Sequence, residues 1–174
     1  MMFDISKSVG CTERMNYLKR GFLFYMCSSC MLLVQFAIYL VNSNYWESLN
    51  FVGGFYYLMA ALGQAFLFNL IPWVILYIPF TWWRQMQKVG TILFSCAIFL
   101  LNVLAYLNGI VFQLYKFHIN GFVLDLAFGG GGNQVFVFNN TLILHGVLIG
   151  LLILLFTLAV VFIAYRYAWY VTSK

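Results

Sequence analysis

Charged side chains are scarce in this sequence. Asp, Glu, Lys and Arg together make up 7% of its 174 residues, whereas a soluble domain carries roughly 25%. Hydrophobic residues reach 64%, and the mean hydropathy is +0.93. So few charges cannot cover the surface of a water-soluble globule. The shortage of charge therefore excludes an ordinary soluble domain and predicts an integral membrane protein.

Acidic residues are the scarcer sign, with 4 Asp and Glu against 9 Lys and Arg, for a net charge of +5. In a soluble protein such an excess can indicate nucleic-acid binding. Here the basic residues stand beside long apolar runs, where they set topology and meet anionic headgroups. The expected partners are membrane lipids, anionic phospholipids among them, and no nucleic acid.

Cysteine is also infrequent, with four residues. Cys27 and Cys30 form a C-x-x-C pair, a spacing that can hold zinc or carry redox chemistry. The pair lies inside the first apolar run and has neither a second C-x-x-C nor a nearby histidine. It is better explained as small residues packed against a neighbouring helix, and no cofactor is expected.

Four long apolar runs dominate what is present. A helix of about 20 residues crosses the hydrocarbon core, which is roughly 30 Å thick. The predicted spans cover residues 21–42, 51–80, 89–108 and 141–165. The second contains Pro72, which removes a backbone N–H and predicts a kink. The runs predict an all-α integral membrane protein, a four-transmembrane-helix bundle occupying residues 21–174.

The basic residues predict the orientation of these spans. Eight of the nine Lys and Arg residues precede the first span, join the second to the third, or follow the fourth. The exception is Lys116, in the 109–140 segment. By the positive-inside rule both termini are cytoplasmic, residues 1–20 form a basic cytoplasmic N-terminus, and 109–140 faces the periplasm of a Gram-negative inner membrane.

Close packing in a membrane depends on small residues, because lipid is as apolar as the helices themselves. Small residues four apart occur at Ala61 and Ala65 in the second span and at Gly146 and Gly150 in the fourth. These four residues are the candidates for helix–helix contact.

Polar residues inside the spans are few. Gln35, Gln64 and Asn69 are predicted to be buried and to form hydrogen bonds between helices. The alternative is that Gln64, Asn69 and the kink at Pro72 line a substrate path, which would make the chain a small multi-pass transporter or channel subunit. Ionisable residues at mid-span, which such a path usually contains, are missing.

The segment between spans three and four, residues 109–140, interrupts the apolar pattern. Its first part contains "FQLYKFHINGFV" and is predicted to form one or two interfacial periplasmic helices, with Lys116 reaching toward lipid phosphate. Asn120 precedes a glycine and signals a turn, and "GGGGN" farther on predicts a flexible link. Lys116, His118, Asn120 and Asp125 are the candidate lipid or interface residues.

The same segment offers little for catalysis. His118 and Asp125 could serve a membrane enzyme acting on lipid, and together with His145 they could in principle hold a metal ion. No Ser or Cys nucleophile stands beside them, and the glycine run lacks the Lys-Ser/Thr ending of a phosphate-binding loop. The expectation is therefore a non-enzymatic chain with no catalytic residues and no metal site.

The sequence of this segment is similar to that of a known protein family. It resembles the periplasm-facing stretch of YejM (PbgA)-like inner-membrane proteins, which belong to the alkaline-phosphatase/sulfatase superfamily. Their pattern is an aromatic residue near the end of span three, then Phe/Tyr-basic-x-His-hydrophobic-Asn-Gly/Pro. The matching positions are Phe112, Tyr115, Lys116, His118, Ile119, Asn120, Gly121 and Val123. The order of basic N-terminus and spans is similar as well, and Asn108 stands where many members have an acidic residue.

The resemblance implies a function for the membrane part of such proteins. That part is similar to an anchor and a lipid- or partner-sensing module in lipopolysaccharide and cell-envelope homeostasis. Anionic phospholipid and a cytoplasmic or membrane protein are the implied partners. The family's hydrolase-like domain, with its metal ligands, follows a fifth span and is expected to lie outside these 174 residues.

Overall fold

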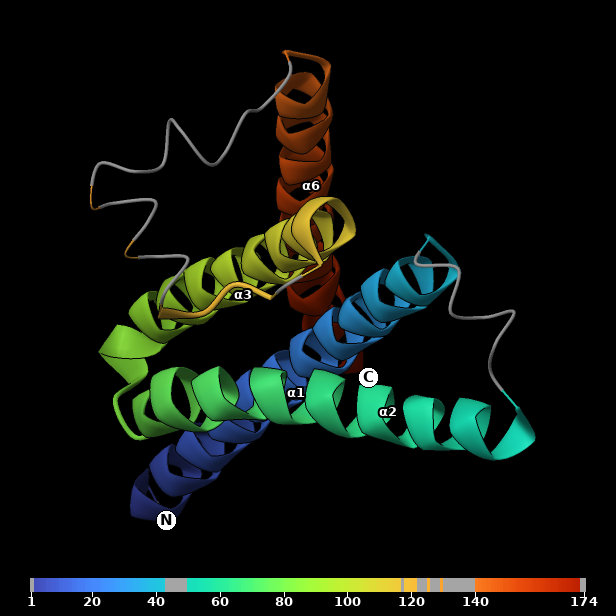
Figure 1. Ribbon diagram of the computed structural model, residues 1–174. Helices are drawn as coiled ribbons and strands as arrows, with labels where there is room; N and C mark the ends of the chain where they lie inside the picture. The colour runs from blue at the N-terminus through green and yellow to red at the C-terminus, as the bar shows by residue number, and fades with distance from the viewer. Residues whose placement is uncertain are drawn as a thin grey trace.

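The computed structural model describes residues 2–42, 50–116, 118–121, 125, 129 and 140–172. All regular structure in these residues is helical. The long helices, labelled as in Figure 1, are α1 (Met2–Asn42), α2 (Phe51–Pro72), α3 (Gln87–Tyr115) and α6 (Asn140–Thr172). Short π and 3-10 turns join α2 to α3. The prediction of an all-α chain is confirmed.

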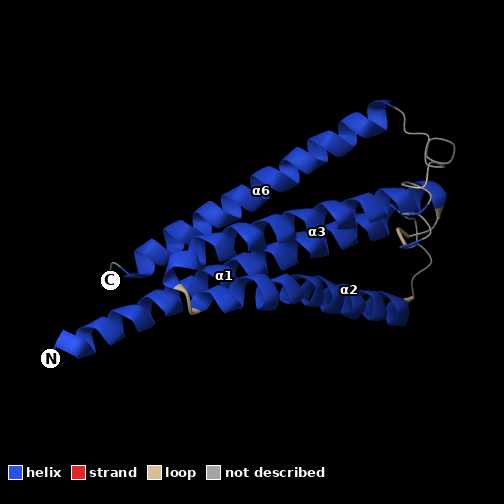
Figure 2. Cartoon of the chain, turned by 90° about the vertical axis from the view of Figure 1, so that its left-hand side faces the viewer, coloured by secondary structure: helices blue, strands red, loops and turns tan. Residues whose placement is uncertain are grey.

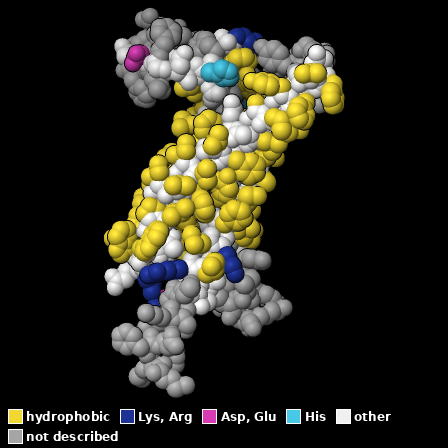
Figure 3. All heavy atoms as spheres, turned by 90° about the horizontal axis from the view of Figure 1, so that it is seen from below, with side chains coloured by type: hydrophobic (Ala, Val, Ile, Leu, Met, Phe, Trp, Pro, Cys, Tyr) yellow, Lys and Arg dark blue, Asp and Glu magenta, His cyan; other side chains and the backbone are white. Residues whose placement is uncertain are grey.

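Four helical stretches are long and apolar enough to cross a membrane. They are Thr12–Val41, Phe51–Thr81, Arg84–Tyr115 and Ile143–Arg166. Figure 3 shows the hydrophobic side chains as a broad belt, with Lys and Arg gathered mainly below it and a histidine above it. The four predicted spans are therefore present, and we treat the chain as a multi-pass membrane protein.

The helices of the bundle meet the two sides of the membrane at an inner end and an outer end. The inner end is where α1 and α3 begin and α6 ends, and the outer end is where α1 and α3 end and α2 and α6 begin. The helices extend beyond the predicted spans: α1 starts at Met2, α3 runs to Tyr115 and α6 runs to Thr172. The apolar pattern marks only the part in hydrocarbon, whereas backbone hydrogen bonding continues past it where no proline intervenes.

The second span changes its helical type where the kink is predicted. The α-helix ends at Pro72, a π-helical turn covers Trp73–Tyr77, and a 3-10 turn covers Ile78–Thr81. Proline has no N–H to donate and crowds the preceding turn, so the hydrogen-bond pattern shifts after it. The shift turns the ring of Tyr77 into the bundle, where it is 1% exposed.

The core lies in the inner half of the bundle. It consists of aromatic and aliphatic side chains from every span: Tyr17, Phe24, Tyr25, Tyr77, Phe94, Ile98 and Val160. Helix α6 contributes Val160 to this core, and its buried residues in the described part of the chain lie between Ile153 and Ala164. Figure 2 shows α6 close to α1 and α3 at the inner end and diverging from them toward the outer end.

The predicted packing residues are distributed unevenly. Ala61 and Ala65 are buried, at 8% and 0% exposed. A Cβ added at Gly146 or Gly150 would meet nothing within 4 Å, because this part of α6 diverges from the bundle. The close contact predicted for these two glycines is not made within the described part of the chain.

Candidate functional site

The outer end of α3 is closed by a lysine in an unusual conformation. Lys116 has φ 61° and ψ 21°, in the left-handed region, and its backbone N–H donates to the carbonyl oxygen of Phe112 over 2.9 Å. This C-cap usually holds glycine, because a Cβ costs about 1–2 kcal/mol there. Lys116 is the one residue other than glycine with positive φ in the described part of the chain.

This geometry corrects the boundary predicted from sequence. The first seven residues of the 109–140 segment continue α3 rather than forming an interfacial helix. The chain turns at Lys116, before the Asn120-Gly121 pair that signals a turn in the sequence. Val123 and the glycine run after Gly129 lie outside the described residues.

Asn108 holds the chain against α3 after this turn. Its Oδ1 accepts the backbone N–H of Ile119 over 2.8 Å, and its Nδ2 lies 3.1 Å from Nδ1 of His118. The Ile119 N–H fixes which side of the amide carries oxygen, so the Asn108 NH₂ group must donate to the imidazole. In this arrangement Nδ1 of His118 is the acceptor of that bond.

Phe112 forms the centre of this outer-end turn. The His118 ring stacks on it with centroids 4.6 Å apart, and Tyr39 of α1 meets its edge at 5.4 Å. The Lys116 ammonium lies 5.9 Å from the Phe112 centroid. These contacts join the outer ends of α1 and α3 and position an exposed cation beside them.

The four candidate lipid or interface residues, Lys116, His118, Asn120 and Asp125, are all exposed. His118 pairs with Asn108 rather than with Asp125. The Asp125 carbonyl oxygen accepts the N–H of Gly129 over 2.7 Å. Within the described ranges no three His, Cys, Asp or Glu side chains are grouped for a metal ion. His118, Asp125 and His145 are thus not brought together there.

A second polar cluster lies at mid-membrane and joins α1, α2 and α3. Ser28 donates to Oδ1 of Asn69 over 3.2 Å, and Nδ2 of Asn69 donates to Ser29 over 3.2 Å. Nδ2 of Asn102 lies 3.4 Å from Ser28, and Oδ1 of Asn102 accepts from Gln35 over 3.1 Å. Ser28, Ser29, Asn69 and Asn102 are at most 1% exposed. The network links α1, α2 and α3, and Oε1 of Gln35 is its one buried atom without a partner among the described residues.

Sequence reasoning identified only part of this network. Asn69 and Gln35 hydrogen-bond between helices as expected. Gln64 does not: it is exposed, outside the buried face of α2 that Ala61, Ala65 and Asn69 form. Ser28 and Ser29, the two residues between the cysteines of the C-x-x-C, were not predicted to join the network, because a serine in an apolar run can also pack simply as a small residue.

The inner end is held by a pair of tyrosines. The rings of Tyr17 and Tyr77 stack in parallel with centroids 4.1 Å apart, and each hydroxyl donates to the other residue's carbonyl oxygen, over 3.3 and 2.7 Å. Glycine makes room for both rings. A Cβ at Gly21 would overlap the Tyr77 ring, and one at Gly90 would lie 2.6 Å from the Tyr17 hydroxyl.

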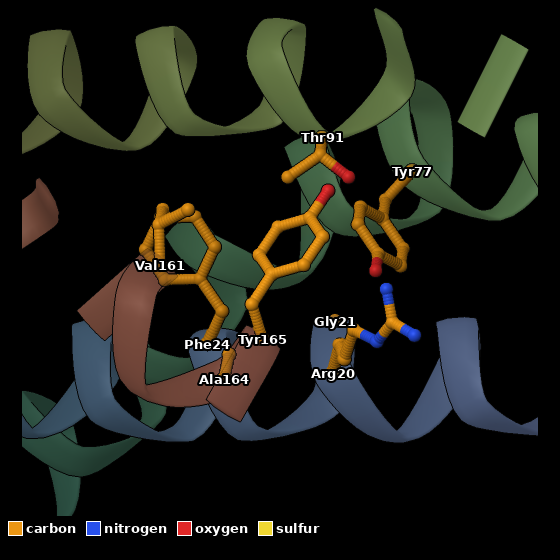
Figure 4. Close-up of a pocket in the computed structure, with 8 residues that line it drawn as sticks. All are labelled: Arg20, Gly21, Phe24, Tyr77, Thr91, Val161, Ala164 and Tyr165. Atoms are coloured by element: carbon orange, nitrogen blue, oxygen red, sulfur yellow. The ribbon is translucent and has the colours of Figure 1, made fainter. Parts of the chain in front are cut away.

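A small cavity lies beside the tyrosine pair (Figure 4). Arg20, Tyr77, Thr91 and Tyr165 turn polar groups toward it, and it has a volume of about 10 Å³. That is space for about one water molecule. The Arg20 guanidinium lies over the Tyr165 ring at 4.9 Å. The inner end is thus closed to anything larger than water at this point.

The α2–α3 connection is tied to α1 at the same end. Nη2 of Arg84 lies 2.6 Å from Oε1 of Glu13, with the two side chains 72% and 36% exposed. An ion pair this exposed contributes on the order of 1 kcal/mol or less. It orients the connection, in which Trp82 and Trp83 are more than 60% exposed.

Comparison with known proteins gives one match. The profile of a family described as a domain of unknown function (DUF3413) matches residues 12–171. No curated protein matches the chain, and no solved structure does. The match takes in all four spans, the outer-end turn and the mid-membrane network.

Proposed function

This chain belongs to the DUF3413 family, and from that premise we propose that it is the membrane domain of a YejM-like protein of a Gram-negative inner membrane. In this proposal both termini are cytoplasmic and the outer end faces the periplasm. The domain anchors the protein and senses anionic phospholipid or a protein partner in cell-envelope homeostasis. It performs no catalysis itself.

The observation that carries the proposal is the conformation of Lys116. Left-handed backbone at this position favours glycine by about 1 kcal/mol or more, yet the chain has a lysine there. Lys116 is exposed and directly follows the last residue of α3, at the outer end of the bundle. A basic residue at that depth meets lipid phosphate, with a gain of about 1 kcal/mol per charge.

The turn supports this role because it fixes the direction of the side chain. Asn108 and His118 bind the returning chain to α3, and the rings of Phe112, His118 and Tyr39 contact one another, with centroids 4.6 to 6.4 Å apart. A lysine on such a support loses less rotamer freedom on meeting a phosphate than one on a free loop. Asn108 is uncharged, so it does not offset the charge of Lys116.

The test separates the charge of Lys116 from its backbone conformation. Purified chain is titrated with phosphatidylglycerol, and bound lipid is counted by native mass spectrometry, with phosphatidylcholine as the neutral control. Lys116→Ala and Lys116→Gly are both expected to weaken phosphatidylglycerol binding about five-fold. Lys116→Arg, which keeps the charge, is expected to retain it.

Two outcomes would contradict the lipid role. If both Lys116→Ala and Lys116→Gly bind phosphatidylglycerol as the wild type does, the ammonium is not a lipid contact. If Lys116→Gly binds normally and only Lys116→Ala is weakened, the loss comes from the strained backbone. Reporter fusions at each terminus test the orientation, and a periplasmic C-terminus would refute it.

The transporter alternative gains no support from the described residues. Asn69 is saturated within the mid-membrane network, Gln64 faces away from the bundle, and Pro72 marks a change of helical type. Asn69 and Pro72 are buried between helices whereas Gln64 is exposed, so the three do not line a common path within the described residues.

A further inference from the structure

Helix α2 lies at the edge of the bundle, with one side toward α1 and the opposite side uncovered by any described element (Figures 1 and 2). On the uncovered side, near the middle of the Phe51–Thr81 span, lies Gln64. Its side chain is exposed and makes no hydrogen bond within the described residues. A primary amide therefore points into the hydrocarbon at mid-membrane.

An amide in that position is unfavourable. The carboxamide has two N–H donors and a carbonyl acceptor, and hydrocarbon satisfies none of them. Water cannot replace the missing partners at this depth. Glutamine is too short to reach the headgroups from mid-span, unlike Lys or Arg at a helix end. Gln64 therefore needs a hydrogen-bond partner on another membrane helix.

The surface around Gln64 permits such a helix to approach closely. Tyr56, Gly63 and Leu67 lie on one stripe of α2, at helical spacing, and are exposed, and the half-buried Ala60 lies between Tyr56 and Gly63 on the same stripe. A Cβ added at Gly63 would meet nothing within 4 Å. The stripe carries no charge, so a second apolar helix meets neither repulsion nor bulk at its centre.

We propose that this stripe, with Gln64 at its centre, is the contact between two copies of this chain. Copies inserted in the same orientation have Gln64 at the same depth, so a two-fold axis along the membrane normal brings the two amides together. Because a carboxamide both donates and accepts, Gln64 pairs with its own counterpart through reciprocal hydrogen bonds. A different partner helix would need its own polar group at that depth.

The test is energy transfer between two populations of the full chain, labelled with donor and acceptor dyes and co-reconstituted in phosphatidylcholine vesicles. The protein-to-lipid ratio is varied to obtain a dimerisation constant. The wild type is expected to associate, and Gln64→Leu to weaken association about five- to thirty-fold. Gln64→Asn, which keeps an amide, is expected to retain part of it.

Matched variants locate the contact. Gly63→Leu places bulk on the stripe and is expected to abolish association without unfolding the chain, since its surroundings are open. Gly150→Leu adds the same bulk at an equally open glycine of α6 and is expected to leave the constant unchanged. A wild type that stays monomeric at every ratio overturns the proposal, as does unchanged association in Gln64→Leu. Loss in Gly150→Leu alone would place the interface on α6.

Discussion

The inner and outer halves of the bundle are built in different ways. In the inner half, side chains from all four spans interlock around the Tyr17–Tyr77 stack, and the remaining space holds about one water. In the outer half, α6 diverges, and α1 and α3 are joined by Tyr39, Phe112 and one asparagine-held turn. The inner half is closely packed, whereas in the outer half more of the helix surfaces are uncovered by other described residues.

The first prediction adds a methyl group to the closely packed inner half. Gly21→Ala places a methyl group where the Tyr77 ring lies, so the ring must leave its stack and both hydroxyls lose their acceptors. We expect a loss of about 3 kcal/mol or more, from overpacking together with broken hydrogen bonds. The measurement is unfolding by sodium dodecyl sulfate in mixed micelles.

The matched control is the same substitution in the outer half. Gly150→Ala adds a methyl group where nothing lies within 4 Å and is expected to change stability by less than about 1 kcal/mol, in the stabilising direction. Equal destabilisation of the two variants would show that the halves do not differ as described.

The second prediction concerns the layer between the halves. Asn102→Leu removes a side chain that is 0% exposed and leaves Gln35 without its acceptor and Ser28 without its Nδ2 partner. We expect a loss of about 1–2 kcal/mol, since hydrogen bonds between membrane helices contribute modestly and the leucine is also bulkier. Unfolding in mixed micelles measures it.

Gln64→Leu is the control for that loss. Gln64 has no hydrogen-bond partner within the described chain, so its replacement is expected to leave the monomer as stable as before or more so. If the two variants lose the same stability, the buried network contributes nothing specific.

The contrast between the halves also explains what the sequence can and cannot predict. A long apolar run in a membrane forms a helix, because a helix satisfies its backbone hydrogen bonds internally. The four spans therefore follow from the composition of the runs alone. Which side of a span faces its neighbours does not follow, because α2 is apolar all round and offers no polar face to orient it. For that reason Gln64 was placed inside and Ser28 was overlooked, although both are polar residues at mid-span.

At the candidate site, too, the sequence predicts some features and not others. The pattern at 112–123 predicted that Lys116, His118 and Asn120 belong to an interfacial segment, and all three are exposed. It could not predict that α3 continues to Tyr115 or that Lys116 is left-handed, because lysine favours continuing a helix. The turn is imposed by a contact ten residues back, between Asn108 and His118.

The third prediction removes that contact. Asn108→Ala deletes both the acceptor for the Ile119 N–H and the donor to His118. We expect the turn to open with a global cost of only about 1 kcal/mol, since the site is exposed. Hydrogen exchange at Ile119 should rise while exchange in the core of α3 stays the same. Unchanged protection at Ile119 would mean that other contacts hold the turn.

The smallest expected effect is a gain. Lys116→Gly removes the Cβ that is unfavourable in the left-handed region and keeps the hydrogen bond from the residue 116 N–H to the Phe112 carbonyl oxygen. The free energy of unfolding is therefore expected to rise by about 1 kcal/mol or slightly less. Lys116→Ala keeps the Cβ and should not gain. If glycine stabilises the fold and also lowers phosphatidylglycerol binding, then lysine is held at this position against the preference of the backbone. If Lys116→Gly does not raise stability, the contact between Lys116 and Phe112 already offsets the cost of the left-handed backbone. In that case the backbone conformation is no longer evidence that the lysine charge has a role.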